Sequence, residues 1–390
     1  MKSHRSVIFF VMFFIFSAAC SLFAQMDDME KEFFEEVAKM EEDYKRFEKQ
    51  AFEEFQREVK AMWGDFVTST KKDWVEYSED KTGRSCVDFE AGEVLVEVVI
   101  PKEEAERDPD SLDKKLTEEI ERLIVDKGKN RNYDLPPKPA KEKKILPSPL
   151  LTSPVLEGQL KDKKGNPVTE KNKKQVAKEI VKTKPVIKKN VKTDKGDMVR
   201  VQVRFLLVPD HVRIRAKRYL DNVRQQAERF SISVPLAFAV IHTESYFNPK
   251  ATSHVPAYGL MQLVPKSGAW DAYKYVYGYG KELSPDYLYD SDNNIELGCA
   301  YLGLIKNRYF RKIPNADNAL YCSIASYNTG VGNLSRALCG KKQLSCAIDK
   351  VNTMKPDELY VYLGKNLHHQ ETRDYLKRVA ERMKLYKEWE

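Results

Sequence analysis

The stretch SVPLAFAVIHTES, Ser233 to Ser245, is apolar on nearly every side when it is wound as a helix. Ser233 can cap the N-terminus of a helix and Pro235 is tolerated in its first turn, while Asn248-Pro249 stops the helix from continuing. A helix that is apolar all round is buried. The sequence therefore predicts a helical core built around this segment.

Glu244, near the end of this stretch, is a candidate general acid. Its carboxyl is expected to be partly desolvated and close to the negative end of the helix dipole, and both effects raise the pKa of a carboxyl group. A general acid that works near neutral pH needs such a shift. A structural Glu paired with a Lys or Arg is the alternative, because structural ion pairs also perturb carboxylates.

Helical patterns dominate the sequence after Pro209-Asp210, whereas the region before it mixes strand and helix signals. A β-hairpin is expected over Gly83–Ile100, a helix over Asp108–Asp126, and a third strand of the same small sheet over Met198–Val208. The stretches that predict the later helices are Val212–Phe230, Val234–Ser245, Ile295–Tyr309, Ala316–Tyr327 and Thr372–Tyr386. The expected fold class is α+β overall, with a mostly helical part after a small α+β domain.

Two upstream segments are rich in lysine. Met26–Trp63 places aromatic residues at steps of three, as from Tyr44 to Phe47, which favours a helix packed on its own domain. Asn130–Lys195 is rich in Lys and Pro and poor in aromatic residues, which is typical of a linker, with a helix expected near Gln175–Val181.

The N-terminus carries an export signal. Basic residues precede an unbroken apolar run, Val7–Phe16, which is followed by small residues and Cys20. The run is shorter than the roughly 20 apolar residues of a membrane span. Cleavage before Cys20 would leave a lipidated cysteine, and an ordinary signal-peptidase site lies after Ala24; the sequence leaves both open. Export predicts a periplasmic protein, attached to the outer membrane where Cys20 is lipidated.

Composition and export limit the chemical class of the binding partner. The 390 residues are enough for two domains, and the formal net charge of +7 favours an anionic partner. Export points to the cell wall or an anionic lipid surface and away from nucleic acid. Without CxxC spacing, and with His368-His369 lacking ligand spacing, no metal site is expected. Cys339 and Cys346 flank a short polar loop and are expected to form a disulfide.

Four short motifs, in this order along the chain, resemble the signatures of the soluble lytic transglycosylase superfamily. They are Glu244–Ser253, Gly259–Pro265, Ala325–Gly330 and Glu371–Tyr375. Upstream, Ala61–Asp65 and Cys86–Glu90 resemble the N-terminal domain of the membrane-bound lytic murein transglycosylase C family. The resemblance implies a lysozyme-like catalytic domain over 209–390, preceded by a signal peptide over 1–24 and an N-terminal domain over 25–208 with a linker-like part over 130–195.

The resemblance also implies roles for the motif residues. Glu244 would be the catalytic acid and base, and no metal or cofactor would be required. The residues implied to bind substrate are Ser253, Gln262, Tyr327, Asn328 and Glu371. Gln262 offers a donor and an acceptor, which suits an N-acetyl group. Tyr327 adds a hydroxyl beside a flat apolar ring, which suits a sugar.

The implied reaction cleaves the β-1,4 bond between N-acetylmuramic acid and N-acetylglucosamine in peptidoglycan and leaves 1,6-anhydromuramyl ends. The alternatives are a hydrolytic muramidase of the same fold, a non-catalytic wall-binding lipoprotein, and an accessory enzyme of a pilus or secretion system with the same chemistry. Glycan strands are the expected partner, together with a lipid anchor if Cys20 is modified. The sequence names no protein partner.

Overall fold

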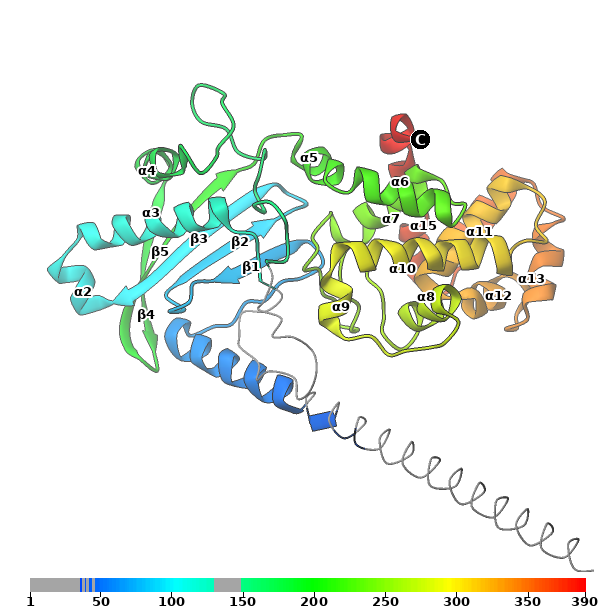
Figure 1. Ribbon diagram of the computed structural model, residues 1–390, viewed down its shortest axis with the longest axis horizontal. Coiled ribbons are helices and arrows are strands. Elements are labelled where there is room, and N and C mark those ends of the chain that lie inside the picture. The colour runs from blue at the N-terminus through cyan, green and yellow to red at the C-terminus, as the bar shows by residue number, and fades with distance from the viewer. Residues whose placement is uncertain (1–35, 37–38, 40–41, 44–45, 130–148) are drawn as a thin grey trace, which may run out of the picture. The chain divides into compact units, whose positions relative to one another are not determined.

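The computed structural model describes residues 36, 39, 42–43, 46–129 and 149–390 (Figure 1). The expected signal peptide and Cys20 lie outside these residues. The chain divides into two compact units, Met1–Val59 with Arg131–Leu146, and Lys60–Asn130 with Pro147–Glu390. Residues 46–63 are helical, which confirms the aromatic-step prediction for that part of the chain. Across the described ranges, no helix is both long and apolar enough to cross a membrane.

A five-stranded antiparallel sheet lies in the second unit, in the order β1-β2-β3-β5-β4. The expected hairpin is confirmed as β2 (Gly83–Asp88) and β3 (Glu93–Pro101), and the expected third strand is β5 (Gly196–Leu206), which pairs with β3. Two strands were not expected: β1 (Asp73–Tyr77) and β4 (Val186–Thr193). β1 is short, and β4 is an edge strand rich in Lys, so neither shows a clear strand pattern.

Helices cover one face of this sheet (Figure 1). The expected helix is confirmed as α3 (Asp110–Val125), which follows the short α2 (Lys102–Arg107). Leu116, Ile120 and Leu123 of α3 are fully buried in the same apolar cluster as the inward-facing valines of the strands. In this cluster, the residues of α3 recur mostly every three to four positions, and those of β3 at every second position. The apolar face of the helix therefore packs on the apolar face of the sheet.

Part of the segment that composition indicates as a linker is folded. The expected helix is α4 (Lys173–Thr183), and β4 follows it directly. Before α4, Val155 and Leu160 are buried against the sheet cluster. The lysines face outward while a few apolar side chains face inward. The core positions are too few to change the average composition of the segment, so composition alone indicates a linker.

The second half of the unit is helical. It consists of α5 (His211–Lys217), α6 (Leu220–Arg229), α7 (Val234–Ser245), α8 (Gly268–Tyr277), α9 (Pro285–Tyr289), α10 (Ser291–Gly303), a π-helical turn (Leu304–Tyr309), α11 (Ala316–Thr329), α12 (Val331–Cys339), α13 (Leu344–Val351), α14 (Pro356–Asn366), α15 (Gln370–Met383) and a final 3-10 turn (Lys384–Trp389). The stretch expected as one helix over Val212–Phe230 is two helices, with a break at Arg218-Tyr219.

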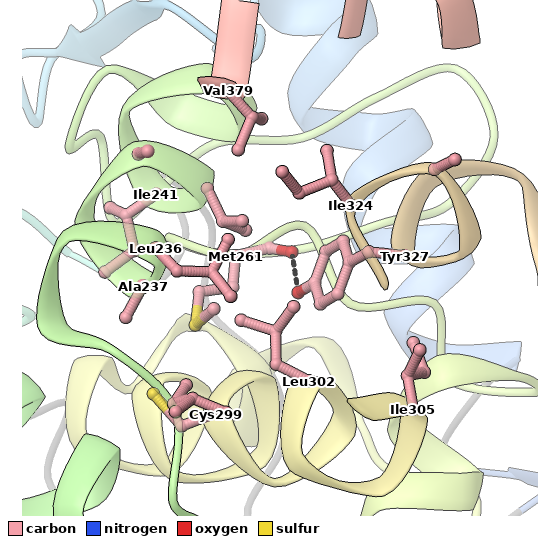
Figure 2. Packing of buried hydrophobic residues seen from close by; sticks show 14 of the residues in the cluster. Leu236, Ala237, Ile241, Met261, Cys299, Leu302, Ile305, Ile324, Tyr327 and Val379 are labelled. Carbon is pink, nitrogen blue, oxygen red and sulfur yellow. Dashed lines mark hydrogen bonds between the residues drawn. The ribbon is translucent and has the colours of Figure 1, made fainter. Parts of the chain in front are cut away.

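α7 is the core helix, as predicted. Ser233 caps it by accepting a hydrogen bond from the Leu236 amide, and Pro235 occupies its first turn. Figure 2 shows Ile241 and its α7 neighbours packed with Met261, Cys299 and Ile324. α15, α6 and the final 3-10 turn pack directly on this helix, and none of its residues is exposed.

The disulfide expected between Cys339 and Cys346 is wrong, because both residues are free thiols. Cys339 is the last residue of α12, and its thiol donates to the carbonyl oxygens of Lys341 and Gln343 in the following loop, at 3.7 and 3.8 Å. The pKa of the Cys346 thiol is raised chiefly by its hydrogen bond with Cys339, so the two thiols are neighbours that are not covalently joined.

Candidate active site

Glu244 lies in the last turn of α7 with only 6% of its surface exposed. Burial raises the pKa of its carboxyl. The Lys71 ammonium opposes this rise, with its Nζ 3.5 Å from Glu244 Oε2, and the Tyr375 hydroxyl opposes it too. The negative charge of Glu371 adds to the rise. The carboxyl is thus kept in a dry site between one cation and one acidic neighbour, which suits a group that must both donate and accept a proton.

Two tyrosines from different helices interact electrostatically with the Glu244 carboxyl. Tyr327 of α11 donates a hydrogen bond of 2.8 Å to the Met261 carbonyl, which Figure 2 shows as a dashed line. Tyr375 of α15 is buried beside Glu244, and its hydroxyl makes no hydrogen bond of normal geometry within the described residues. Burial, together with the nearby carboxylate, raises the pKa of both phenols, so both stay protonated as donors.

Gln262 presents an unused acceptor. Its Nε2 donates to the carbonyls of Ala251 and Gly259, at 2.9 and 3.1 Å. Its Oε1 is buried and has no partner among the described residues. Gln262 also has a positive φ of 49°, a left-handed conformation that side chains other than Gly seldom adopt. A strained residue with an unsatisfied acceptor is typical of a ligand-binding position.

The turn that carries Gln262 is fixed to the core. Ser245 Oγ, next to Glu244, donates to the Leu260 carbonyl at 2.8 Å. Asn294 of α10 is fully buried and accepts from the Met261 amide at 2.7 Å. The first and second motifs are therefore joined directly by a hydrogen bond between the residue after Glu244 and a residue two positions before Gln262.

Gly259 allows this turn to close, and Gly259→Ala is expected to lower the free energy of unfolding by about 1–3 kcal/mol. Its φ is +76°, and a Cβ there would come within 2.2 Å of the Leu288 carbonyl oxygen. Gly278 is a matched control, because its φ is +85° and a Cβ would meet nothing within 4 Å. Urea unfolding of both Ala variants separates the clash from the backbone strain. Equal losses of stability in the two variants would show that the clash with the Leu288 carbonyl oxygen does not destabilise the fold.

The third and fourth motifs are linked as well. Asn328 Oδ1 accepts from Thr372 Oγ1 at 2.7 Å, so Asn328 ties the end of α11 to the start of α15. Glu371 is exposed in the first turn of α15, one turn before Tyr375. Ser253 lies apart in an exposed loop, where its hydroxyl donates to the Val255 carbonyl. Tyr327 and Glu371 thus interact electrostatically with Glu244, whereas Gln262 and Asn328 are linked to the site through hydrogen bonds that they or their neighbours make. Ser253 has only a contact within its own loop.

Two residues of the site were not singled out from sequence. Tyr375 falls inside the fourth motif, and its place one turn after Glu371 on a helix was the available signal. Lys71 comes from the segment before β1 and lies outside every motif. Since β1 itself was not expected, nothing in the sequence placed Lys71 beside α7.

The chain that follows Glu244 binds the sheet. The Asn248 side-chain amide donates to the carbonyls of Thr70 and Asp73, both at 3.2 Å. Lys250 Nζ pairs with Glu76 Oε1 of β1 at 2.6 Å, and both side chains are buried. The loop after α7 is therefore joined to β1 and the segment before it by hydrogen bonds and one buried ion pair.

The histidine on α7 has a packing role. His242, in α7, is hydrogen-bonded through Nδ1 to the Tyr386 hydroxyl at 2.9 Å. Burial and the nearby Arg382 lower its pKa to about 3, so it stays neutral in a packing role. Within the described part of the chain, no three His, Cys, Asp or Glu residues are grouped so that they could hold a metal ion.

Comparison with known proteins finds matches over both halves. Residues 221–348 match the family described as Transglycosylase SLT domain, and residues 40–218 match Membrane-bound lytic murein transglycosylase C, N-terminal domain. A membrane-bound lytic murein transglycosylase C of Yersinia enterocolitica is 31% identical, over 84% of this chain and 86% of the relative. One of Haemophilus influenzae is 29% identical, over 84% and 85%.

Solved structures match over a shorter length. The 70 kDa soluble lytic transglycosylase of Escherichia coli is 25% identical with a TM-score of 0.33, and the match covers 44% of this chain and 24% of that chain. The lytic transglycosylase Slt of Pseudomonas aeruginosa gives 25% and 0.32, over 43% and 24%. This chain thus spans about a quarter of those proteins. The expected fold class, α+β overall with a mostly α lysozyme-like catalytic part after a small sheet, is confirmed by the element content and the matched families.

Proposed function

Because the chain belongs to the membrane-bound lytic murein transglycosylase C family, we propose that it cleaves peptidoglycan glycan strands by a lytic transglycosylase reaction with Glu244 as the catalytic acid and base. The observation that carries this proposal is the buried carboxyl at the end of α7, whose pKa is raised by burial. A carboxylic acid that holds its proton near neutral pH can pass it to a glycosidic oxygen.

The reaction takes place in two proton transfers. Glu244 donates its proton to the oxygen between N-acetylmuramic acid and N-acetylglucosamine, and the bond from that oxygen to the muramyl C1 breaks. The oxygen of the neighbouring acetamido group stabilises the positive centre left at C1. The Glu244 carboxylate then removes the proton from the C6 hydroxyl as O6 bonds to C1, which closes the 1,6-anhydro ring. The carboxyl ends as it began, and no water is consumed.

The surroundings of Glu244 support a mechanism with one catalytic carboxylate. Most glycosidases use two, but enzymes whose substrate supplies the second group are an exception. Lys71 and two tyrosines bear on Glu244, and the acidic neighbour, Glu371, is exposed in the first turn of α15. We assign Glu371 to positioning of the substrate, and no second nucleophile is needed.

Substrate contacts are assigned to the remaining motif residues. The free Oε1 of Gln262 can accept the N–H of an acetamido group, which would satisfy its buried acceptor. Tyr327 gives a ring face and a hydroxyl beside the reacting centre. Asn328 shapes the site through Thr372, and Ser253 reaches the glycan from its exposed loop.

We also assign a place and a domain layout. Residues 209–390 carry the chemistry, residues 25–208 form the N-terminal domain, and residues 1–24 are removed on export to the periplasm. Lipid attachment at Cys20 would anchor the protein to the outer membrane, and cleavage after Ala24 would release it. The intact mass of the native mature protein distinguishes the two, and a mass that includes Met1 would contradict export.

The type of product tests the function. Purified full-length protein is expected to release soluble fragments from sacculi whose muramyl ends resist borohydride, because an anhydro ring has no free reducing group. A muramidase used as the comparison leaves reducible ends. Reducible ends from this protein would replace the proposal with hydrolysis on the same fold, and no release at all would favour a non-catalytic wall-binding role.

A further inference from the structure

The segment before β1 is held against the end of the catalytic helix by contacts on both sides of Lys71. On one side, the Thr70 carbonyl accepts from the Asn248 amide at 3.2 Å. On the other, Lys72 Nζ pairs with Glu90 at 2.8 Å, and Tyr246 donates to the same carboxylate at 2.6 Å. Tyr246 and Asn248 follow Glu244 by two and four residues, so the backbone at Lys71 is fixed relative to the catalytic carboxyl.

Lys71 uses that position to reach Glu244. Its Nζ lies 3.5 Å from Glu244 Oε2, and the side chains are 41% and 7% exposed. The ammonium therefore keeps part of its hydration while it faces a carboxyl that has lost nearly all of its own. An opposite charge at this distance favours the ionised form of the carboxyl.

We propose that Lys71, supplied by the segment before β1, is a positioning residue of the catalytic site that keeps Glu244 a strong enough acid to release its proton to the glycosidic oxygen. This inference rests on the function proposed above and adds a role for the N-terminal domain in the reaction. Without a nearby cation, burial alone would make Glu244 hold its proton too tightly, and the first proton transfer would slow.

The other groups around Glu244 do not replace this cation. From α15, the Tyr375 hydroxyl lowers the pKa of Glu244 less than Lys71 does, and Glu371 raises it. From α11, Tyr327 is a buried neutral phenol whose own pKa is raised. Loss of the Lys71 charge is thus expected to raise the pKa of Glu244.

The pH dependence of kcat/KM tests this role, because its alkaline limb reports the acid of the free enzyme. On soluble glycan strands, Lys71→Met and Lys71→Gln are expected to move that limb to higher pH by about one unit, the low end of the range for an opposite charge because Lys71 is half-exposed. Lys71→Arg keeps the charge and is expected to restore the wild-type limb. Lys174→Met removes one charge from the exposed face of α4 and is expected to leave the limb unchanged.

Each outcome has one meaning. An unshifted limb in folded Lys71→Met and Lys71→Gln overturns the inference, as does an equal shift in Lys174→Met, which would reflect net charge alone. Circular dichroism monitors the folding of the variants. Loss of folding in both uncharged variants would assign Lys71 a structural role and would also overturn the inference. If the wild-type protein forms no anhydro ends, the proposed function fails instead, so the two failures are distinct.

Discussion

Glu244→Gln is expected to reduce turnover on peptidoglycan by well over the ~10²–10⁴-fold that one acid/base contribution supplies. The reason is that the proposed mechanism assigns both proton transfers to one carboxyl, so its loss would remove the acid of the first step and the base of the second. Gln keeps the size of Glu and much of its hydrogen bonding, so the buried end of α7 should remain folded. Turnover is measured on sacculi with wild type and variant at equal concentration.

Glu371→Gln is the matched control, since it makes the same substitution on the acidic neighbour that faces Glu244. A smaller loss is expected, because Glu371 is exposed and is assigned to positioning. Glycan binding by Glu244→Gln should largely survive through Gln262 and Tyr327. Near-normal turnover by Glu244→Gln would show that Glu244 is a structural residue and not the catalyst.

Lys250→Met is expected to lower the free energy of unfolding by about 3–5 kcal/mol, because it leaves Glu76 as a buried carboxylate without its partner. The pair joins β1 to the loop after the catalytic helix at 2.6 Å, with side chains 8% and 2% exposed. Burial raises the pKa of Glu76 even with Lys250 present. Without Lys250 the pKa rises further, so the variant should be most stable below the unfolded pKa of Glu and should lose stability as pH rises.

Two further variants test this explanation. The double variant Glu76→Leu with Lys250→Met should recover most of the loss, because apolar side chains can replace a buried pair at little cost. Lys266→Met breaks an exposed pair with Glu282, whose side chains are 79% and 41% exposed, and should change stability by no more than about 0.5 kcal/mol. Urea unfolding at several pH values measures all four proteins. A double variant as unstable as Lys250→Met would show that the stranded charge is not the cause.

The parts of the fold that were predicted depend on local patterns. α7 follows from an apolar run with a Ser cap and an early Pro. β2 and β3 follow from two short runs rich in apolar residues on either side of Ala91-Gly92, and β5 follows from alternation of valines with polar residues. Such signals lie within one element, so a single sequence contains them. The Lys-rich β4 was missed because an edge strand buries little and keeps its lysines in solvent.

The parts of the site that were missed depend on contacts between distant segments. Glu244 could be placed from its helix and motif alone, and Gln262 and Tyr327 from theirs. Lys71 reaches Glu244 only because Asn248 binds the backbone before β1, and no spacing in the sequence records that meeting. The two cysteines expected to form a disulfide are neighbouring free thiols, so the sequence predicted their proximity but not that they stay unbonded.

Digestion of sacculi in water enriched in heavy oxygen, followed by mass spectrometry of the released muropeptides, tests the central claim most directly. The wild-type protein is expected to give muramyl ends that lack one water and carry no heavy oxygen, because O6 of the same sugar closes the ring. Glu244→Gln is expected to give essentially none of them, while Glu371→Gln gives a reduced amount. Heavy oxygen at the new muramyl ends, or anhydro ends from Glu244→Gln at the wild-type level, would contradict the account.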